Sequence, residues 1–340
     1  MPENITFRTQ LVGSVTDFCI STALPILGKA LNLVELIVLL ARYKEEGVKL
    51  CPTVYLTNDI EKLSALLPDG ERLKIGSGPP DSTGLKQALK KCAPLSNGGW
   101  NVYVQNLGAE VEYGLFRGSL HPVSVLIDDV IMTPNDDLRV VKAYQVADEC
   151  VEVSANNGSR HYIFLDHRKE DSPPPLRYLD KLVSAVMEHA GEDVKEPAVS
   201  FLKRQLFDSL RQSHGCLIAV TNMREAPKFL SEDGVMLESP IDLPALVESL
   251  RKDRISAAYL ESKGSLLGGM LNSDGILLFD SRGRVLGYNC FVKTGKNDAV
   301  IGGARRRAFS TLKEKIGRGL SAAFMQSQDG WSDFIGGNDE

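Results

Sequence analysis

Two short segments in the second half of the chain carry the residue types best suited to polyphosphate chemistry. Asp274 and Gly275 open an apolar run, and residues 303–307, which read Gly-Ala-Arg-Arg-Arg, precede a stretch with a helical pattern. A carboxylate can hold a divalent metal or take a proton. Arginines and the free N–H groups of a helix start bind phosphate oxygens. Because arginine in a first helical turn opposes the helix dipole unless an anion is near, these segments predict a phosphate site.

Apolar spacing in the second half predicts the elements that must position these segments. We expect helices over 176–190, 196–213, 243–250 and about 304–316, and strands over 216–220, 277–279, 285–291 and 322–326. A turn at 280–283 makes a hairpin of the second and third strands. Asp274 therefore lies just before the first hairpin strand, and the arginines open the helix that follows the second.

The first half has the pattern of a smaller mixed α/β domain. We expect a helix over 23–45, a loop at 76–81, and strands over 51–56, 101–105, 109–116, 123–131, 140–146, 150–154 and 161–165, mostly as an antiparallel meander. Charges and three consecutive prolines between 167 and 175 predict a stiff, polar connector. The expected domains are residues 1–166, a linker and connecting helix over 167–195, and residues 196–335.

Composition narrows the class of protein. The chain has 340 residues and a net charge of −5, which argues against general nucleic-acid binding. Its six cysteines form no CxxC pair, so we expect free thiols in a reducing cytoplasm rather than a zinc site. The most apolar stretch, 23–41, is interrupted by Lys29, Asn32 and Glu35, and we expect neither a membrane span nor a leader peptide.

Residues 196–335 resemble the diadenylate cyclase domain of bacterial enzymes that make cyclic di-AMP. That family carries an Asp-Gly-Ala motif and a Gly-Thr-Arg-His-Arg motif, which stand here as 274–276 (Asp-Gly-Ile) and 303–307. The family's aromatic strand resembles 289–292 (Asn-Cys-Phe-Val), and its acidic strand end resembles 327–330 (Ser-Gln-Asp-Gly). The first half is similar in layout to the sensor domain that precedes some of these cyclase domains.

The resemblance implies an α/β (α+β) fold, with a mixed central sheet flanked by helices after a smaller sensor-like α/β domain. It implies that two ATP molecules are condensed into cyclic di-AMP and two pyrophosphates in a homodimer or larger homo-oligomer with facing cyclase domains. The metal would be Mg²⁺ or Mn²⁺, with Co²⁺ as an alternative, held by Asp274 and Asp329. Asp274, Gly275, Arg305 and Arg307 are the implied catalytic residues. The implied nucleotide-binding residues are Phe291, Gly303, Ala304, Arg305, Arg306, Arg307 and Ser327.

Four positions depart from the family pattern. Ile276 stands for a small alanine and is expected to crowd the turn, Ala304 lacks a hydroxyl, Arg306 replaces a histidine, and Gln328 leaves Asp329 as the lone acid. Loss of one hydrogen bond to a charged group costs roughly 1.5–3 kcal/mol, or about ten- to a hundredfold in rate. The alternative function is therefore a catalytically weakened module that binds ATP or a cyclic dinucleotide as a sensor.

Each candidate also has a purely structural interpretation. Asp-Gly before a strand is common turn chemistry, and arginines at a helix start often form a solvated face. Core packing explains Phe291 as well as adenine contact does. Trp331 either caps the pocket or seals a dimer. Plain structural roles are also open for His214, Lys293 and Lys296, for the turn Asp329–Gly330, and for the glycine-rich stretch 76–78, which lacks the ending of a phosphate loop.

Overall fold

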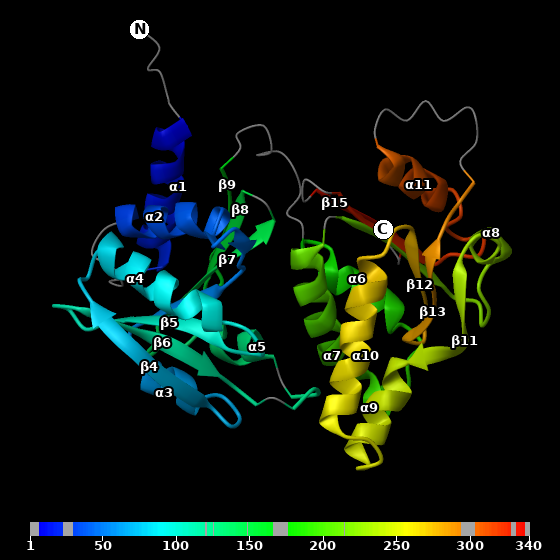
Figure 1. Ribbon diagram of the computed structural model, residues 1–340, viewed down its shortest axis with the longest axis horizontal. Coiled ribbons are helices and arrows are strands. Elements are labelled where there is room, and N and C mark those ends of the chain that lie inside the picture. The colour runs from blue at the N-terminus through cyan, green and yellow to red at the C-terminus, as the bar shows by residue number, and fades with distance from the viewer. Residues whose placement is uncertain are drawn as a thin grey trace, which may run out of the picture. The chain divides into compact units, whose positions relative to one another are not determined.

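The computed structural model describes residues 7–22, 30–119, 121–124, 126–147, 149–165, 176–213, 215–293, 303–327 and 331–336. These residues form two compact units. The first unit contains the described residues up to 119 together with 126–165, and the second contains 121–124 together with 176–336. Each unit has its own sheet and its own apolar core (Figure 1).

The first unit is built on a seven-stranded mixed sheet. Its strand order is β4 (Glu71–Gly78), β6 (Val111–Arg117), β5 (Asn101–Asn106), β3 (Thr53–Thr57), β7 (Val140–Ala147), β8 (Cys150–Ala155) and β9 (Arg160–Phe164). Strands β3 and β5 run parallel, and the other neighbouring pairs are antiparallel. The sheet is therefore largely the antiparallel arrangement that the sequence predicts, with one parallel pair at its centre.

Helices lie on both faces of this sheet. One face packs against α1 (Phe7–Thr22), α2 (Ala30–Ala41) and α4 (Ser82–Cys92), and the other against the short α3 (Ile60–Ala65) and α5 (Ile127–Ile131). Strand β3 shows why both faces are filled: Val54 and Leu56 face the larger cluster, and Tyr55 faces the smaller one. A small hairpin, β1 (Lys44–Glu45) with β2 (Val48–Lys49), follows α2.

The second unit is built on a six-stranded mixed sheet. Its order is β11 (Val235–Asp242), β13 (Arg284–Cys290), β12 (Ile276–Asp280), β10 (Cys216–Thr221), β14 (Ala322–Gln326) and β15 (Ser332–Gly336). Strands β10 and β12 are parallel, and the remaining pairs are antiparallel. The central strands are buried along their whole length, which explains why they read as continuous apolar runs.

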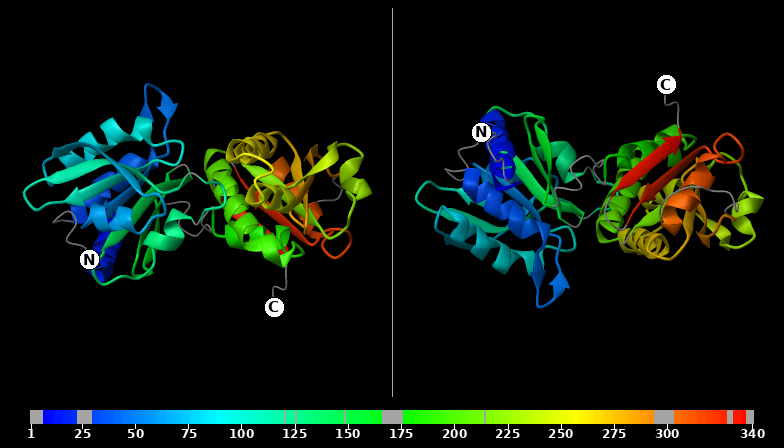
Figure 2. Two further views of the ribbon diagram at one scale, coloured as in Figure 1. Left: turned by 90° about the horizontal axis from the view of Figure 1, so that it is seen from below. Right: turned by 90° about the horizontal axis from the view of Figure 1, so that it is seen from above.

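Two helical layers enclose this sheet (Figure 2). One face carries α6 (Leu179–Val186), α7 (Glu192–Gln212), α9 (Leu243–Arg251) and α10 (Ala257–Leu271), and the other carries α8 (Lys228–Ser231) and α11 (Ala304–Lys313). On β10, Ile218 and Val220 join the first layer's cluster, and Leu217 and Ala219 join the other. The predicted α/β (α+β) fold class is confirmed, with a mixed sheet flanked by helices in the second unit.

Three predicted segments have a different structure from the one that the sequence predicts. Residues 127–131 form α5 rather than a strand; Asp128 and Asp129 lie in its first turn, where acidic side chains favour a helix start. Residues 76–78 belong to β4 rather than a loop, because Gly76 pairs with Tyr113 and leaves room for that ring. In the expected helix 23–45, the structure shows α2 over Ala30–Ala41 and then the β1–β2 hairpin, while 23–29 lie outside the described residues.

The expected connecting helix lies within the second unit. Leu182 and Val186 of α6 are fully buried in one apolar cluster with Phe201 of α7. The apolar face of α6 makes this helix part of the core of the second unit. Among the described residues, no helix is long and apolar enough to cross a membrane.

Candidate functional site

Most of the predicted site segments lie at one edge of the six-stranded sheet, the edge at which β10 and β12 begin and β13 and β14 end. At this edge Ile276, the first residue of β12, pairs with Leu217 of β10 and with Cys290, the last residue of β13. One residue further out, Cys216 pairs with Gln326 at the end of β14. Neighbouring strands lie roughly 4.8 Å apart. The residues just before β12, just after β13 and just after β14 therefore lie along one short stretch of sheet edge.

The Asp274–Gly275 turn is shaped by the strand beside it. Gly275 has φ +90°, and a Cβ there would lie 2.8 Å from the carbonyl oxygen of Cys290. Only glycine fits, because both the backbone conformation and the space exclude a side chain. Asp274 is exposed, and its Oδ1 accepts the N–H of Gly275 at 3.0 Å. The turn therefore has a structural role and also presents a carboxylate at the sheet edge.

Phe291 lies next to this turn and points out of the core. The register between β12 and β13 shifts after Ile276, and Asn289 has φ +51°, which together mark a β-bulge. After the bulge Cys290 is fully buried, whereas the Phe291 side chain is 43% exposed. This exposure argues against core packing as the role of the ring and leaves part of the residue accessible at the edge.

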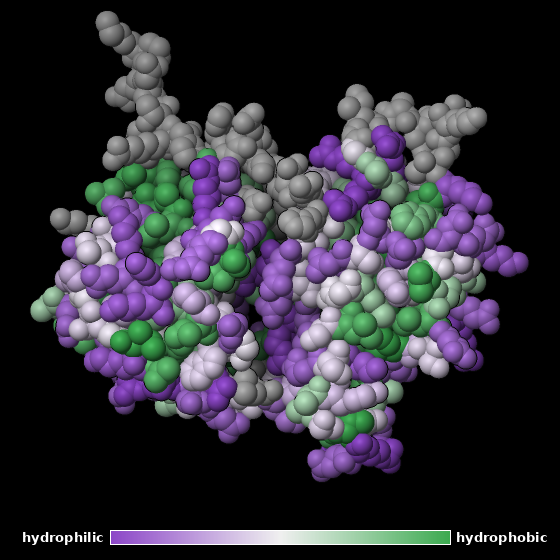
Figure 3. All heavy atoms as spheres, in the orientation of Figure 1, coloured by the Kyte–Doolittle hydropathy of each residue, from purple (hydrophilic) through white to green (hydrophobic). Residues whose placement is uncertain are grey.

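Helix α11 starts at the same edge. Gly303 is its N-cap and makes no side-chain cap hydrogen bond, Ala304 follows as an exposed first residue, and no acidic residue lies in the first turn. On the face shown in Figure 3, hydrophilic side chains lie near α11 among paler ones. The helix contacts β14 and β10. Arg306 of its first turn contacts Trp331, which directly precedes β15, and Ser332 of β15 pairs with Gln326 at the end of β14. The N–H groups at the start of α11 therefore lie near the end of β14.

The three arginines of α11 point in different directions. Arg305 is partly buried and lies on the same helical face as the buried Phe309, whereas Arg306 and Arg307 are exposed. Burial raises the pKa of the Cys216 thiol to about 12, and the nearby positive charge of Arg305 opposes this shift. Arg305 therefore lies near Cys216, at the start of β10.

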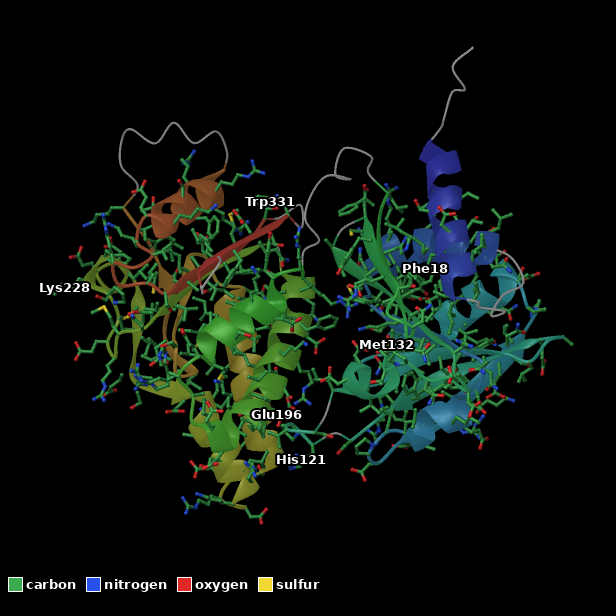
Figure 4. The ribbon with its side chains drawn as sticks, turned by 180° about the vertical axis from the view of Figure 1, so that it is seen from behind. Phe18, His121, Met132, Glu196, Lys228 and Trp331 are labelled. Carbon is green, nitrogen blue, oxygen red and sulfur yellow. The ribbon has the colours of Figure 1, made fainter. Side chains whose placement is uncertain are left out.

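Arg306 lies on the other side of the helix start, against Trp331. Its guanidinium carbon is 4.8 Å from the centre of the indole ring. The Ser327 N–H donates to the Trp331 carbonyl at 2.7 Å, and the Trp331 N–H donates to Ser327 Oγ at 3.1 Å. Ser327 therefore fixes the entry into β15, a role that the sequence did not indicate. Figure 4 labels Trp331 at the start of that strand.

Several predicted residues cannot be placed at this edge. Asp329 and Gln328 lie outside the described residues, as do His214 and Lys296. Lys293 is largely exposed and pairs with Glu232 at 3.2 Å. Of the two predicted metal ligands, the structure therefore places Asp274 alone.

No group of three or more His, Cys, Asp or Glu side chains that could hold a metal occurs within the described ranges. Mg²⁺ is usually held by one or two carboxylates together with substrate phosphates, so a shared ion fits Asp274 better than an all-protein cage does.

Ile276 does not crowd the turn as the sequence suggested. Its side chain is 1% exposed and packs in the cluster between the sheet and α11, together with Leu217 and Phe309. The larger side chain at this position therefore stabilises the layer that carries the arginines. The expected crowding was wrong because the residue points into the core rather than toward the sheet edge.

Sequence reasoning missed two features of this edge, the proximity of Arg305 to Cys216 and the contact of Arg306 with Trp331. Both involve segments that only the strand order brings together. No family model and no curated protein matches this chain. The functional argument therefore rests on the residues and geometry of this edge.

Proposed function

We propose that the second unit is a diadenylate cyclase, which condenses two ATP molecules into cyclic di-AMP and two pyrophosphates. One observation carries the proposal. A single sheet edge holds the exposed carboxylate of Asp274, the exposed ring of Phe291 and a helix start with three arginines and no acidic residue in its first turn. These are the groups that a nucleoside triphosphate needs around its sugar, base and phosphates.

Each group has a separate role in this proposal. The free N–H groups of α11, with Arg305 and Arg307, bind the triphosphate and stabilise the charge that develops on the α-phosphate and the departing pyrophosphate. The Phe291 ring stacks on the adenine. Asp274, near the 3′-hydroxyl, takes its proton as that oxygen attacks the α-phosphate of the second ATP. Phosphoryl-type transfer is mostly positioning and charge stabilisation, which these residues supply.

A divalent ion fits this edge as a group shared with the substrate. Asp274 would hold Mg²⁺ or Mn²⁺ together with phosphate oxygens, and Asp329 is the second candidate ligand. The ion would supply further neutralisation of the polyphosphate charge.

Each copy of the chain binds one ATP at this edge, so the reaction needs two copies that face each other. The proposed enzyme is therefore a homodimer or a larger homo-oligomer. ATP as the substrate is consistent with a cytoplasmic enzyme. The first unit, as a separate compact body, is the proposed regulatory domain.

A nucleotide sensor is the second candidate, and Ala304 favours it. Ala304 opens α11 without a hydroxyl, and Gly303 adds no side-chain hydrogen bond. The helix start can then bind phosphates through N–H groups and arginines while turnover is lost. Tight ATP binding without any product would support this candidate.

Turnover by matched variants separates the two candidates. The full-length protein is incubated with ATP and Mg²⁺, Mn²⁺ or Co²⁺ at dimeric concentrations, and products are identified by chromatography with mass detection. We expect cyclic di-AMP from the wild type and from Asp253→Asn, an exposed position with φ +53° that asparagine tolerates. Asp274→Asn should yield none. Unchanged ATP in every reaction would contradict the cyclase, and failure to bind any adenine nucleotide would contradict both candidates.

A further inference from the structure

Arg306 and Trp331 form a stacked pair beside the start of α11. Arg306 is the third residue of the helix and is exposed, and its guanidinium carbon lies 4.8 Å from the centre of the indole ring. Trp331 lies directly before β15, at the end where Ser327 leaves β14. The contact therefore joins the start of α11 to the part of the sheet edge that is farther from Asp274, where β14 ends and β15 begins.

The indole ring is a fixed platform for this cation. The Trp331 backbone exchanges two hydrogen bonds with Ser327, at 2.7 and 3.1 Å. The ring also packs against the apolar cluster beneath α11. A long arginine side chain that stacks on such a ring loses much of its freedom before any ligand binds. The helix start thus holds Arg306 in a defined position.

The chemical type of the group that contacts Arg306 matters as much as the position of the arginine. A carboxylate would fix an arginine and also cancel its charge. An aromatic face fixes the guanidinium through its π electrons and leaves the positive charge in place. The N–H donors of a guanidinium lie in its plane, so a ring above that plane leaves donors free to turn toward an anion. The stack therefore fixes the Arg306 guanidinium, with its positive charge, beside the N–H groups at the start of α11.

We infer that Trp331 is a positioning residue, which holds Arg306 to bind the polyphosphate of the nucleotide. Arg305 lies toward Cys216 on one side of the helix start, and Arg306 is held toward β15 on the other. An extended polyphosphate can touch both cations, whereas a single phosphate can touch only one closely. This inference rests on the proposed nucleotide function.

A double-mutant cycle on ATP affinity tests the positioning role. Calorimetry compares wild type, Trp331→Leu, Arg306→Gln and the double variant, with Trp331→Phe as the conservative variant in case leucine disturbs folding. We expect Trp331→Leu to weaken ATP binding roughly two- to thirtyfold, the range of a cation–π contact. Phenylalanine should restore part of the loss. In the Arg306→Gln background the leucine change should have no further effect. An equal loss in both backgrounds would overturn the inference, because the ring would then act without Arg306.

Tryptophan emission tests the stack without any nucleotide. The chain has two tryptophans, so Trp100→Phe leaves Trp331 as the sole reporter. Arg306→Gln should change its emission, whereas Arg307→Gln, which removes the same charge one residue away, should not. Equal effects of the two changes would contradict the stack. If the wild type binds no ATP at all, the proposed function fails together with the phosphate role of Arg306, while the emission comparison still decides whether the pair exists.

Discussion

The first and second units both place a mixed sheet between helical layers, with one parallel strand pair near the centre, β3 with β5 and β10 with β12. Beside α3 in the first unit, Lys74 of β4 meets Glu112 of β6 at 2.7 Å, and Arg72 of β4 meets Glu61 of α3. These residues line a hollow of about 540 Å³. The hollow is polar, but its cations and carboxylates already satisfy one another.

The second unit arranges its charges differently. Three arginines follow one another at the start of α11, the first turn of that helix has no acidic residue, and Arg306 meets an aromatic ring. Like charges gathered at a helix start are costly unless an anion offsets them. The comparison indicates that similar architecture does not locate the site. What separates the second unit's edge from the first unit's hollow is the sign and grouping of the charges.

The largest expected effect comes from removing one charge at the proposed site. Arg305→Met should lower kcat/KM for cyclic di-AMP formation by about 10²–10³, the usual cost of losing one donor to a developing oxyanion. Arg72→Met, which removes a paired cation in the first unit, is the matched control and should leave kcat/KM unchanged. Steady-state kinetics measures kcat/KM for both variants. Equal losses of kcat/KM in the two variants would contradict the proposed difference between the units.

Stacking on Phe291 should have the next largest effect. Phe291→Ala is expected to weaken ATP binding by about 1–3 kcal/mol, the usual value of a base–aromatic stack. Leu73→Ala removes a similarly exposed apolar side chain from the first unit, where Leu73 is 49% exposed, and should have no effect. Calorimetric titration with ATP distinguishes them. If Phe291→Ala binds ATP with unchanged affinity, the Phe291 ring does not contact the nucleotide.

Replacing one glycine by alanine in each unit compares the two units in terms of the free energy of unfolding. Gly275→Ala should destabilise the second unit by about 2–4 kcal/mol, because φ +90° is strained and the new Cβ meets the Cys290 carbonyl at 2.8 Å. Gly108 in the first unit has a similar φ of +88°, but no atom lies within 4 Å of the place that a Cβ would take, so Gly108→Ala should cost only about 1–2 kcal/mol. Denaturant unfolding measures both values. Equal costs would show that the overlap with Cys290 is relieved.

The smallest expected effect concerns pH and the first unit. Burial alone would raise the pKa of Glu112, but hydrogen bonds from Lys74 and Tyr103 and nearby positive charges outweigh it and lower the pKa. A carboxyl group with a lowered pKa stabilises the fold above its unfolded pKa, and this stability is lost as the pH falls through the folded pKa. Glu112→Gln should therefore show a weaker decline in unfolding midpoint on acidification than the wild type does. If the unfolding midpoints of the wild type and Glu112→Gln decline equally on acidification, Glu112 does not contribute to the pH dependence of stability.

The sequence predicts the elements with strong apolar runs and misses those without. Strands β10, β12 and β14 are continuous apolar runs and are predicted, whereas β4 carries charges and glycines on an edge of its sheet and is predicted partly as a loop. Helix α10 is not predicted, because three glycines weaken its helical pattern.

The site was predictable only in part. Asp274 and the arginines stand out by residue type and order, and the glycine of the turn is explained by its φ. The proximity of Arg305 to Cys216 and the contact of Arg306 with Trp331 depend on which strands are neighbours. Strand order across a mixed sheet is set by long-range packing rather than by local pattern, so no spacing in the sequence specifies these contacts.

Photoaffinity labelling with 8-azido-ATP tests the central claim most directly, because it asks which charged region of the molecule binds the nucleotide. The full-length protein is labelled with Mn²⁺ present, with and without excess ATP, and the labelled peptides are identified by mass spectrometry. Labels that ATP removes should fall on peptides from the end of β13 and the start of α11. Two results would contradict the account. In one, excess ATP prevents labelling only at the hollow beside β4 and β6 in the first unit. In the other, excess ATP prevents no labelling at all.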